Sequence, residues 1–332
     1  MKNNLLIASA LMTAAMVATG TTESAAQSRR TDFIPYSEVG IGVGTSSYYG
    51  ELSGYRKPIR STFQLIRWNA GLMYTRHFTP HFAARAGFTY ARIVGDDYTY
   101  NRKNAAEDIA LYVRNLHFRN DLKEFALTGI YKFVGDGRNT NYRAKFTPYI
   151  FAGIALAAHS PEAKTPVNFE PDQEQRWVKL QPLGTEGQGQ PGYAKPYSLV
   201  AVAIPVGFGF RYMLNERFNV AAEISYRFTG TDYLDDVGAP GPADPSVLKD
   251  DLARAMSNRS LEPTAARKGG DREQQLRDFL TGQDPFANNG ALLPGVPERT
   301  RGAKGVLNDG YMTTSIQLHY VLLPKIKCPP VK

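Results

Sequence analysis

Residues 199–229 read LVAVAIPVGFGFRYMLNERFNVAAEISYRFT, which is two amphipathic stretches joined by a tight turn. In 199–212 and in 217–229, apolar or aromatic residues alternate with glycine, small, polar or charged ones. A period of two is typical of a β-strand, because successive side chains point to opposite faces of a sheet. The link at 213–216 is short enough to join antiparallel neighbours, so this region predicts a β-hairpin.

The same alternation recurs along the chain and predicts eight antiparallel strands. They are expected at 38–46, 64–78, 82–94, 122–133, 147–158, 199–212, 217–229 and 311–322. Each is close to the roughly 9–11 residues that a tilted strand needs to cross the hydrocarbon of a membrane. Only 147–158 is apolar on both faces, so its pattern does not settle which face points outward.

Charged side chains share the predicted strands with the apolar ones but occupy the opposite faces. They are Arg67, Arg85, Glu124, Arg211, Glu223 and Arg227. A soluble barrel would turn its apolar face inward, whereas in lipid that face points outward and the charges pair inside a narrow lumen. Such a sheet must close, because unpaired backbone groups in hydrocarbon cost several kcal/mol each. We therefore predict an all-β fold, an eight-stranded antiparallel outer-membrane β-barrel plugged by side chains.

The connections between the predicted strands alternate in length. The links after the second and sixth strands span a few residues, and long loops are expected at 95–121, 159–196 and 230–310. With an even strand count, both termini and the short turns face the periplasm, and the long loops are extracellular. Short helices are expected within 102–114 and 271–280. Since 238–310 is poor in large apolar residues, we expect much of it to be mobile, the alternative being a small separate domain.

The first residues of the chain predict export. Lys2 precedes an uncharged, mostly apolar run at 5–18, and small residues follow at 24–26, so we expect a signal peptide at 1–26. The alternative, a single membrane anchor, is disfavoured because the run is shorter than the roughly 20 residues of a spanning helix. The net charge of +8 is spread along the chain without a nucleic-acid motif, so we expect no nucleic-acid partner.

Cys328 is the one cysteine of the chain and lies just past the last predicted strand, in the expected periplasmic tail 323–332. The periplasm is oxidising, and a cysteine without an internal partner there favours an intermolecular disulfide. We expect a periplasmic protein as the partner, with a free thiol as the alternative. One cysteine also gives no Cys/His metal spacing, and we expect no metal or cofactor.

Two acidic pairs follow predicted strands at one rim of the barrel: Asp96 with Asp97, and Asp235 with Asp236. Paired carboxylates can activate a water molecule or hold a cation. No histidine is adjacent to either pair, although His117 could approach through its loop. Because Arg114 and Arg119 are near in sequence, we expect the acids to serve structural pairing rather than catalysis.

Four motifs, taken in order, resemble those of PorG-like proteins, the outer-membrane barrels of the type IX secretion machinery. They are GTSSYYGEL at 44–52, GDD at 95–97, RNLHFRNDL at 114–122 and TDYLDDV at 231–237. The resemblance implies a non-enzymatic component that links a periplasmic ring, built of lipoprotein and soluble subunits, to the outer membrane. It implies no small-molecule substrate. The alternatives are an outer-membrane hydrolase that uses the rim carboxylates and a surface adhesin that uses the long loops.

Overall fold

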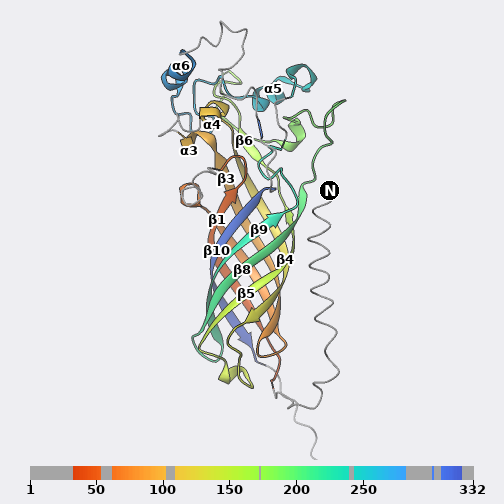
Figure 1. The fold of residues 1–332 in the computed structure, drawn as a ribbon, viewed down its shortest axis with the longest axis vertical. Helices are drawn as coiled ribbons and strands as arrows, with labels where there is room; N and C mark the ends of the chain where they lie inside the picture. Colours follow the sequence, from red (N-terminus) through yellow and green to blue (C-terminus); the bar gives the residue numbers. More distant parts are fainter. Residues whose placement is uncertain are drawn as a thin grey trace, which may run out of the picture.

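The computed structural model describes residues 33–53, 62–101, 109–171, 173–238, 243–281, 301–302 and 308–323. Eight long strands are β1 (Tyr36–Tyr49), β2 (Arg67–His77), β3 (Phe82–Asp96), β4 (His117–Lys132), β5 (Phe146–Ala158), β8 (Val200–Met213), β9 (Phe218–Thr229) and β10 (Gly310–Leu322). Their order is β3-β2-β1-β10-β9-β8-β5-β4, and β3 pairs with β4 to close the ring (Figure 1). Every pairing between these strands is antiparallel. The predicted eight-stranded antiparallel barrel is confirmed.

A band of apolar side chains covers the outside of the barrel. Val43 and Ile316 are 65% and 67% exposed, and Phe88 and Phe208 also point away from the lumen. Exposed apolar surface of this extent is stable only against another apolar medium, so the band is the part of the barrel that lipid covers. In the described part of the chain, no helix is both long and apolar enough to cross a bilayer.

Strand β5, whose facing the sequence left open, turns Ile150 and Ile154 outward and Tyr149 and Phe151 inward. The inward pair packs with Ala83 and other buried residues. Tyr149 points inward because its hydroxyl donates a hydrogen bond to the Glu223 carboxylate in the lumen, and it would have no such partner in lipid.

Strands β3 and β4 extend beyond the rest of the barrel at the end that carries the long loops, here called the loop end (Figure 1). β4 begins at His117 rather than at 122, because 117–121 pairs with the last residues of β3. Two short strands, β6 (Glu162–Lys164) and β7 (Trp177–Lys179), continue the sheet from β4. This extension is polar: Arg92 and Asp121 form an ion pair across it. Charge at this position indicates that the strands have left the apolar band.

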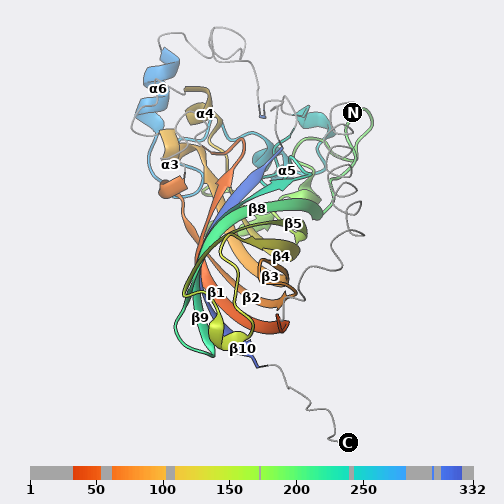
Figure 2. The same cartoon turned by 60° about the horizontal axis from the view of Figure 1, so that its bottom comes forward.

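The loop end is covered by a cap, formed by the described residues of 97–116, 159–199 and 230–281 (Figure 2). Its helices are α3 (Asp97–Asn101), α4 (Ile109–Arg114), η2 (Gln181–Leu183), η3 (Pro245–Val247), α5 (Asp251–Ser257) and α6 (Glu273–Thr281). α4 lies within the segment 102–114, where a helix was predicted, although 102–108 lies outside the described residues. α6 overlaps the helix predicted at 271–280 and ends one residue later.

Part of the loop that was expected to be mobile forms regular elements. Residues 243–281 contain η3, α5 and α6, and Leu248 and Met256 join a buried cluster with Ile93 and Phe118 of the barrel strands. A loop poor in apolar residues can fold when a neighbouring surface supplies the rest of the core. The described residues of this loop therefore pack on the barrel strands.

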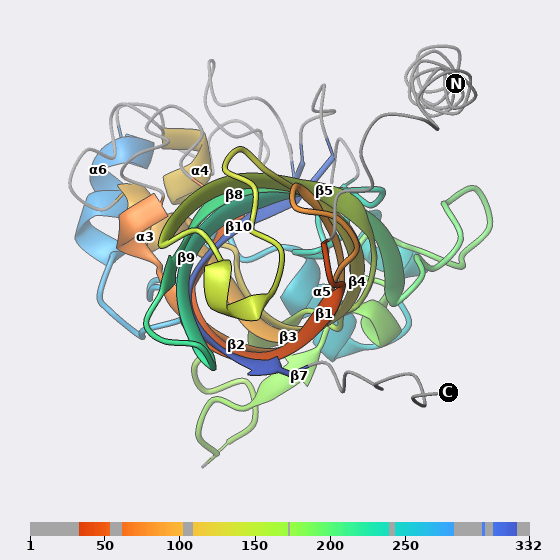
Figure 3. The same ribbon diagram turned by 90° about the horizontal axis from the view of Figure 1, so that it is seen from below.

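The opposite end, called here the turn end, is closed by the link between β4 and β5. This link contains the turn η1 (Thr140–Tyr142) and lies across the barrel opening (Figure 3). The guanidinium of Arg143 ties it to the β8–β9 turn, donating to the backbone oxygens of Asn215 at 2.9 Å and Glu216 at 3.0 Å. The turn end is therefore covered by its own backbone.

Candidate functional site: the barrel lumen and its two ends

The middle of the lumen holds a buried ion pair between opposite walls. Arg85 of β3 donates to Glu223 of β9 at 2.6 Å, and both side chains are almost fully buried. Glu223 also accepts from the Tyr149 hydroxyl at 2.5 Å and from Gln317 Nε2 at 2.7 Å. A carboxylate with three donors is well satisfied, and the pair joins β3, β5, β9 and β10 across the barrel.

A second ion pair lies beside the first. Arg227 of β9 donates to both oxygens of Glu124 of β4, each at 3.1 Å. The Tyr311 hydroxyl donates to the same carboxylate, and Arg227 also donates to Ser225 and Thr313. Four of the six predicted lumen charges thus form two cross-lumen pairs.

The remaining two predicted lumen charges lie near the ends of the barrel. Arg211 of β8 pairs with Asp136 of the β4–β5 link. Arg67, the first residue of β2, donates to the backbone oxygen of Ile66 at 2.6 Å and forms no ion pair with any described residue. Arg67 is half-buried at the loop end, so it is not part of the central network.

An apolar pocket of about 770 Å³ is lined by residues from both faces of the barrel wall, among them Ala83, Phe151 and Phe208. The cavity among the central charges is smaller, about 70 Å³, and is lined by Arg85, Glu124, Glu223, Arg227 and their neighbours. A water molecule occupies about 30 Å³ in the liquid, so the space holds only a few waters. The centre of the barrel is packed with paired charges, as an eight-stranded lumen requires.

Asp136 is the anchor of the turn end. It accepts from the Tyr36 hydroxyl at 2.8 Å and from Lys132 Nζ at 2.5 Å, in addition to Arg211. Although burial opposes ionisation, the Arg211 guanidinium holds the pKa of Asp136 well below its usual range. Close by, Glu38 lies 3.3 Å from both His77 and His319. The sequence did not single out Asp136, because it sits in a turn where no strand period assigns a face.

The first rim pair is held by arginines. Asp96 accepts from Arg267 Nε at 2.7 Å, and Asp97 accepts from two nitrogens of Arg114 at 2.8 Å. Asp97 also accepts from the backbone N–H of Leu116 at 3.0 Å. Burial raises the pKa of Asp97, while Arg114 opposes this effect. Both carboxylates therefore order the loop that follows β3.

The second rim pair is also engaged, but its two acids point to different partners. Asp235 accepts from the Tyr48 hydroxyl at 2.7 Å and from the Val237 N–H at 2.9 Å. Asp236 accepts from the Tyr197 hydroxyl at 2.7 Å and from Arg301 at 3.0 Å. Burial raises the pKa of Asp235 to about 7 and also raises that of Asp236.

The prediction that Arg114 and Arg119 both pair with the rim acids is only partly confirmed, because only Arg114 does so. Arg119 pairs with Glu162 of β6 at 2.8 Å and not with a rim acid. His117 lies opposite Asp96 in the β3–β4 register, yet its Nε2 accepts from the Lys164 N–H at 2.9 Å. No described histidine ring therefore bonds to either acidic pair.

Arginines from 230–310 hold the cap together, and sequence reasoning missed them. Besides Arg267 and Arg301, the buried Arg272 donates to the backbone oxygens of Tyr112 and Ser260, both at 2.6 Å. No periodicity marks such residues in a loop. The signal peptide at 1–26 and Cys328 in the tail lie outside the described residues, so the structure does not place them.

The closed barrel, its apolar outer band and its charged lumen define a β-barrel of the outer-membrane type. A family model described as "Domain of unknown function (DUF6089)" matches residues 27–168, which is less than half of the chain. No curated protein matches the sequence.

The chain is similar at low identity to solved outer-membrane proteins. One is Ail, the attachment invasion locus protein of Yersinia pestis, at 9% identity, 87% of this chain, 99% of that chain and a TM-score of 0.34. Neisserial surface protein A is 9% identical, covers 86% of this chain and 96% of its own, and has a TM-score of 0.33. A major outer membrane protein of Thermus thermophilus is 10% identical, covers 87% of this chain and 99% of its own, and has a TM-score of 0.36. At these values we draw no functional conclusion from the likeness.

Proposed function

We propose that the protein is a non-enzymatic outer-membrane component of a type IX protein secretion machine, in which the barrel anchors a periplasmic ring complex. The observation that carries this proposal is the filled lumen. Two buried ion pairs cross its centre, and the β4–β5 link covers the turn end. Such a barrel suits a solid anchor better than a channel.

The positions of the four resembling motifs support the proposal. They are separate in sequence, at 44–52, 95–97, 114–122 and 231–237, but all lie at the loop end. Tyr48 from the first motif donates to Asp235 of the fourth. The first and fourth motifs therefore belong to one contact region at the loop end.

In the proposed orientation the turn end faces the periplasm, because short turns and both termini of an even-stranded barrel lie on that side. The tail 323–332 is then proposed to be periplasmic, and the lipoprotein and soluble subunits of the ring are the proposed partners. Cys328 in that tail is the proposed site of an intermolecular disulfide.

Purification of the native complex tests the proposal. The full chain is extracted in mild detergent without reductant, beside a Cys328→Ser variant, and the co-purifying proteins are identified by mass spectrometry. We expect periplasmic ring subunits in both samples and a reductant-sensitive band only in the first. A chain that purifies alone would contradict the anchor. Ring subunits without the reductant-sensitive band would contradict only the disulfide.

The folded cap favours a second candidate function, a surface-binding barrel. Several cap residues pack in a buried cluster on the barrel strands, and Leu261 is exposed on the cap surface. Replacing exposed cap residues should then reduce binding to a surface ligand while secretion stays intact. A hydrolase is less favoured, because each of the four rim carboxylates already accepts a hydrogen bond from an arginine or a tyrosine.

A further inference from the structure

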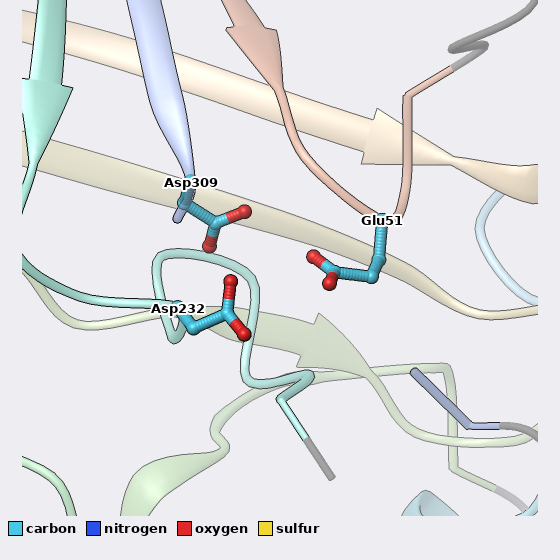
Figure 4. A group of neighbouring side chains, drawn as sticks. All are labelled: Glu51, Asp232 and Asp309. Atoms are coloured by element: carbon cyan, nitrogen blue, oxygen red, sulfur yellow. The ribbon is translucent and has the colours of Figure 1, made fainter. Parts of the chain in front are cut away.

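Three carboxylates from separate segments meet at the loop end of the barrel. Glu51 follows β1, Asp232 follows β9 and Asp309 precedes β10, and Figure 4 shows their carboxylate groups pointing toward one another. One oxygen of each lies within 4.8 Å of the others. Since Ca²⁺ binds oxygens at about 2.3–2.6 Å, two oxygens that share one ion are at most about 5 Å apart. The observed spacing is that of ligands around a single ion.

Glu51 gives an independent indication that a ligand belongs among these acids. Its side chain is only 7% exposed, and its Oε2 accepts no hydrogen bond from any described residue. Asp232 likewise has a buried oxygen, Oδ1, without a donor among the described residues. Buried carboxylate oxygens are normally satisfied, so these two oxygens can each accept a further bond from a ligand.

The surrounding groups do not neutralise the cluster. Arg114 is the arginine that contacts Glu51, but it donates to the backbone oxygen at 2.8 Å, and its side chain is paired with Asp97. The Tyr48 hydroxyl lies 2.6 Å from Asp309 and 2.7 Å from Asp235, yet its single hydrogen serves one of them at a time. Among the described residues, no arginine or lysine side chain forms an ion pair with Glu51, Asp232 or Asp309, so no protein cation occupies the space between the three carboxylates.

We propose that Glu51, Asp232 and Asp309 bind a calcium ion. Ca²⁺ takes six to eight oxygen ligands in flexible geometry, and carboxylates can supply one or two oxygens each. Mg²⁺ requires a tighter octahedron, and Zn²⁺ in structural sites prefers sulfur and nitrogen, so this oxygen set fits calcium best. The ion would join the loop after β1, the loop after β9 and the start of β10, and so brace the mouth of the barrel.

Calcium binding by the full chain in detergent tests the proposal. The protein is stripped with EDTA, dialysed and titrated with CaCl₂ by calorimetry. Tb³⁺ luminescence, excited through tyrosine, gives a second readout, because Tyr48 contacts the cluster. We expect one Ca²⁺ per chain, a midpoint of thermal unfolding that rises with Ca²⁺, and a weaker response to Mg²⁺. Binding of Mg²⁺ as tight as that of Ca²⁺ would overturn the choice of ion.

Two variants distinguish calcium binding at this cluster from weak binding to acidic residues elsewhere on the protein. Glu51→Gln keeps the shape of the side chain and should weaken Ca²⁺ binding at least about tenfold. Glu162→Gln is the control, because that carboxylate is paired with Arg119 at the same end of the barrel. Without Ca²⁺, Glu51→Gln should unfold at or above the wild-type temperature, because it removes repulsion. Absent stoichiometric binding, or equal binding by both variants, would overturn the proposal.

Discussion

Replacing Glu223 by glutamine should destabilise the barrel strongly although the side chain keeps its size. Glu223 balances the charge of Arg85, and both side chains are at most 10% exposed. The variant leaves that guanidinium buried without a counter-charge. Breaking a buried pair in this way costs about 3–5 kcal/mol in free energy of unfolding.

A double variant isolates the charge from the packing. With Arg85→Met added to Glu223→Gln, no unpaired charge stays in the lumen, so the loss should shrink to about 1–2 kcal/mol. The exposed Arg176–Glu170 pair supplies the control, with side chains 55% and 32% exposed. Glu170→Gln should cost less than about 1 kcal/mol, because exposed pairs contribute little.

Equilibrium unfolding in urea measures these differences for the protein refolded into lipid vesicles, with tryptophan fluorescence as the signal. Trp68 lies on the outer face of β2 and reports the transfer from lipid to water. If Glu223→Gln cost less than about 1 kcal/mol, or if adding Arg85→Met did not reduce the loss, the lumen pair would not be the stabilising contact inferred here.

Three further outcomes follow from the same structure. Ile316→Arg, at the middle of β10, should lower the free energy of unfolding in vesicles by about 2–4 kcal/mol. Leu322→Arg, at the end of the strand, should lower it by about 1 kcal/mol or less, and equal losses would contradict the apolar band. Gly44→Ala should lower the unfolding midpoint, because its Cβ would lie 1.9 Å from the Thr314 oxygen, whereas Gly129→Ala meets nothing nearer than 3.9 Å and should be neutral. Burial raises the pKa of Glu186 from 4.5 to about 7, so its contribution to stability is full below pH 4.5 and is lost as the pH rises to about 7. Glu186→Gln should flatten the measured stability in that window, and an unchanged pH profile would refute this.

The sequence by itself determined the barrel, because a strand repeats its environment every second residue. Glycine, valine and isoleucine alternate along 39–44, and this pattern alone assigns each side chain to lipid or to lumen. The same rule predicted that Arg85 and Glu223 point inward. It could not pair them, since they are 138 residues apart and the register of every intervening strand decides which lumen groups meet.

Only the tertiary structure decided what happens at the two ends. Residues 243–281 looked too polar to fold, yet Leu248 packs against barrel strands that supply the apolar surface the loop lacks. Glu51, Asp232 and Asp309 come from three segments and share no spacing, so no local pattern marks them. Loops have no period, and their side chains acquire neighbours only when the closed barrel brings strand ends from distant parts of the chain to one rim.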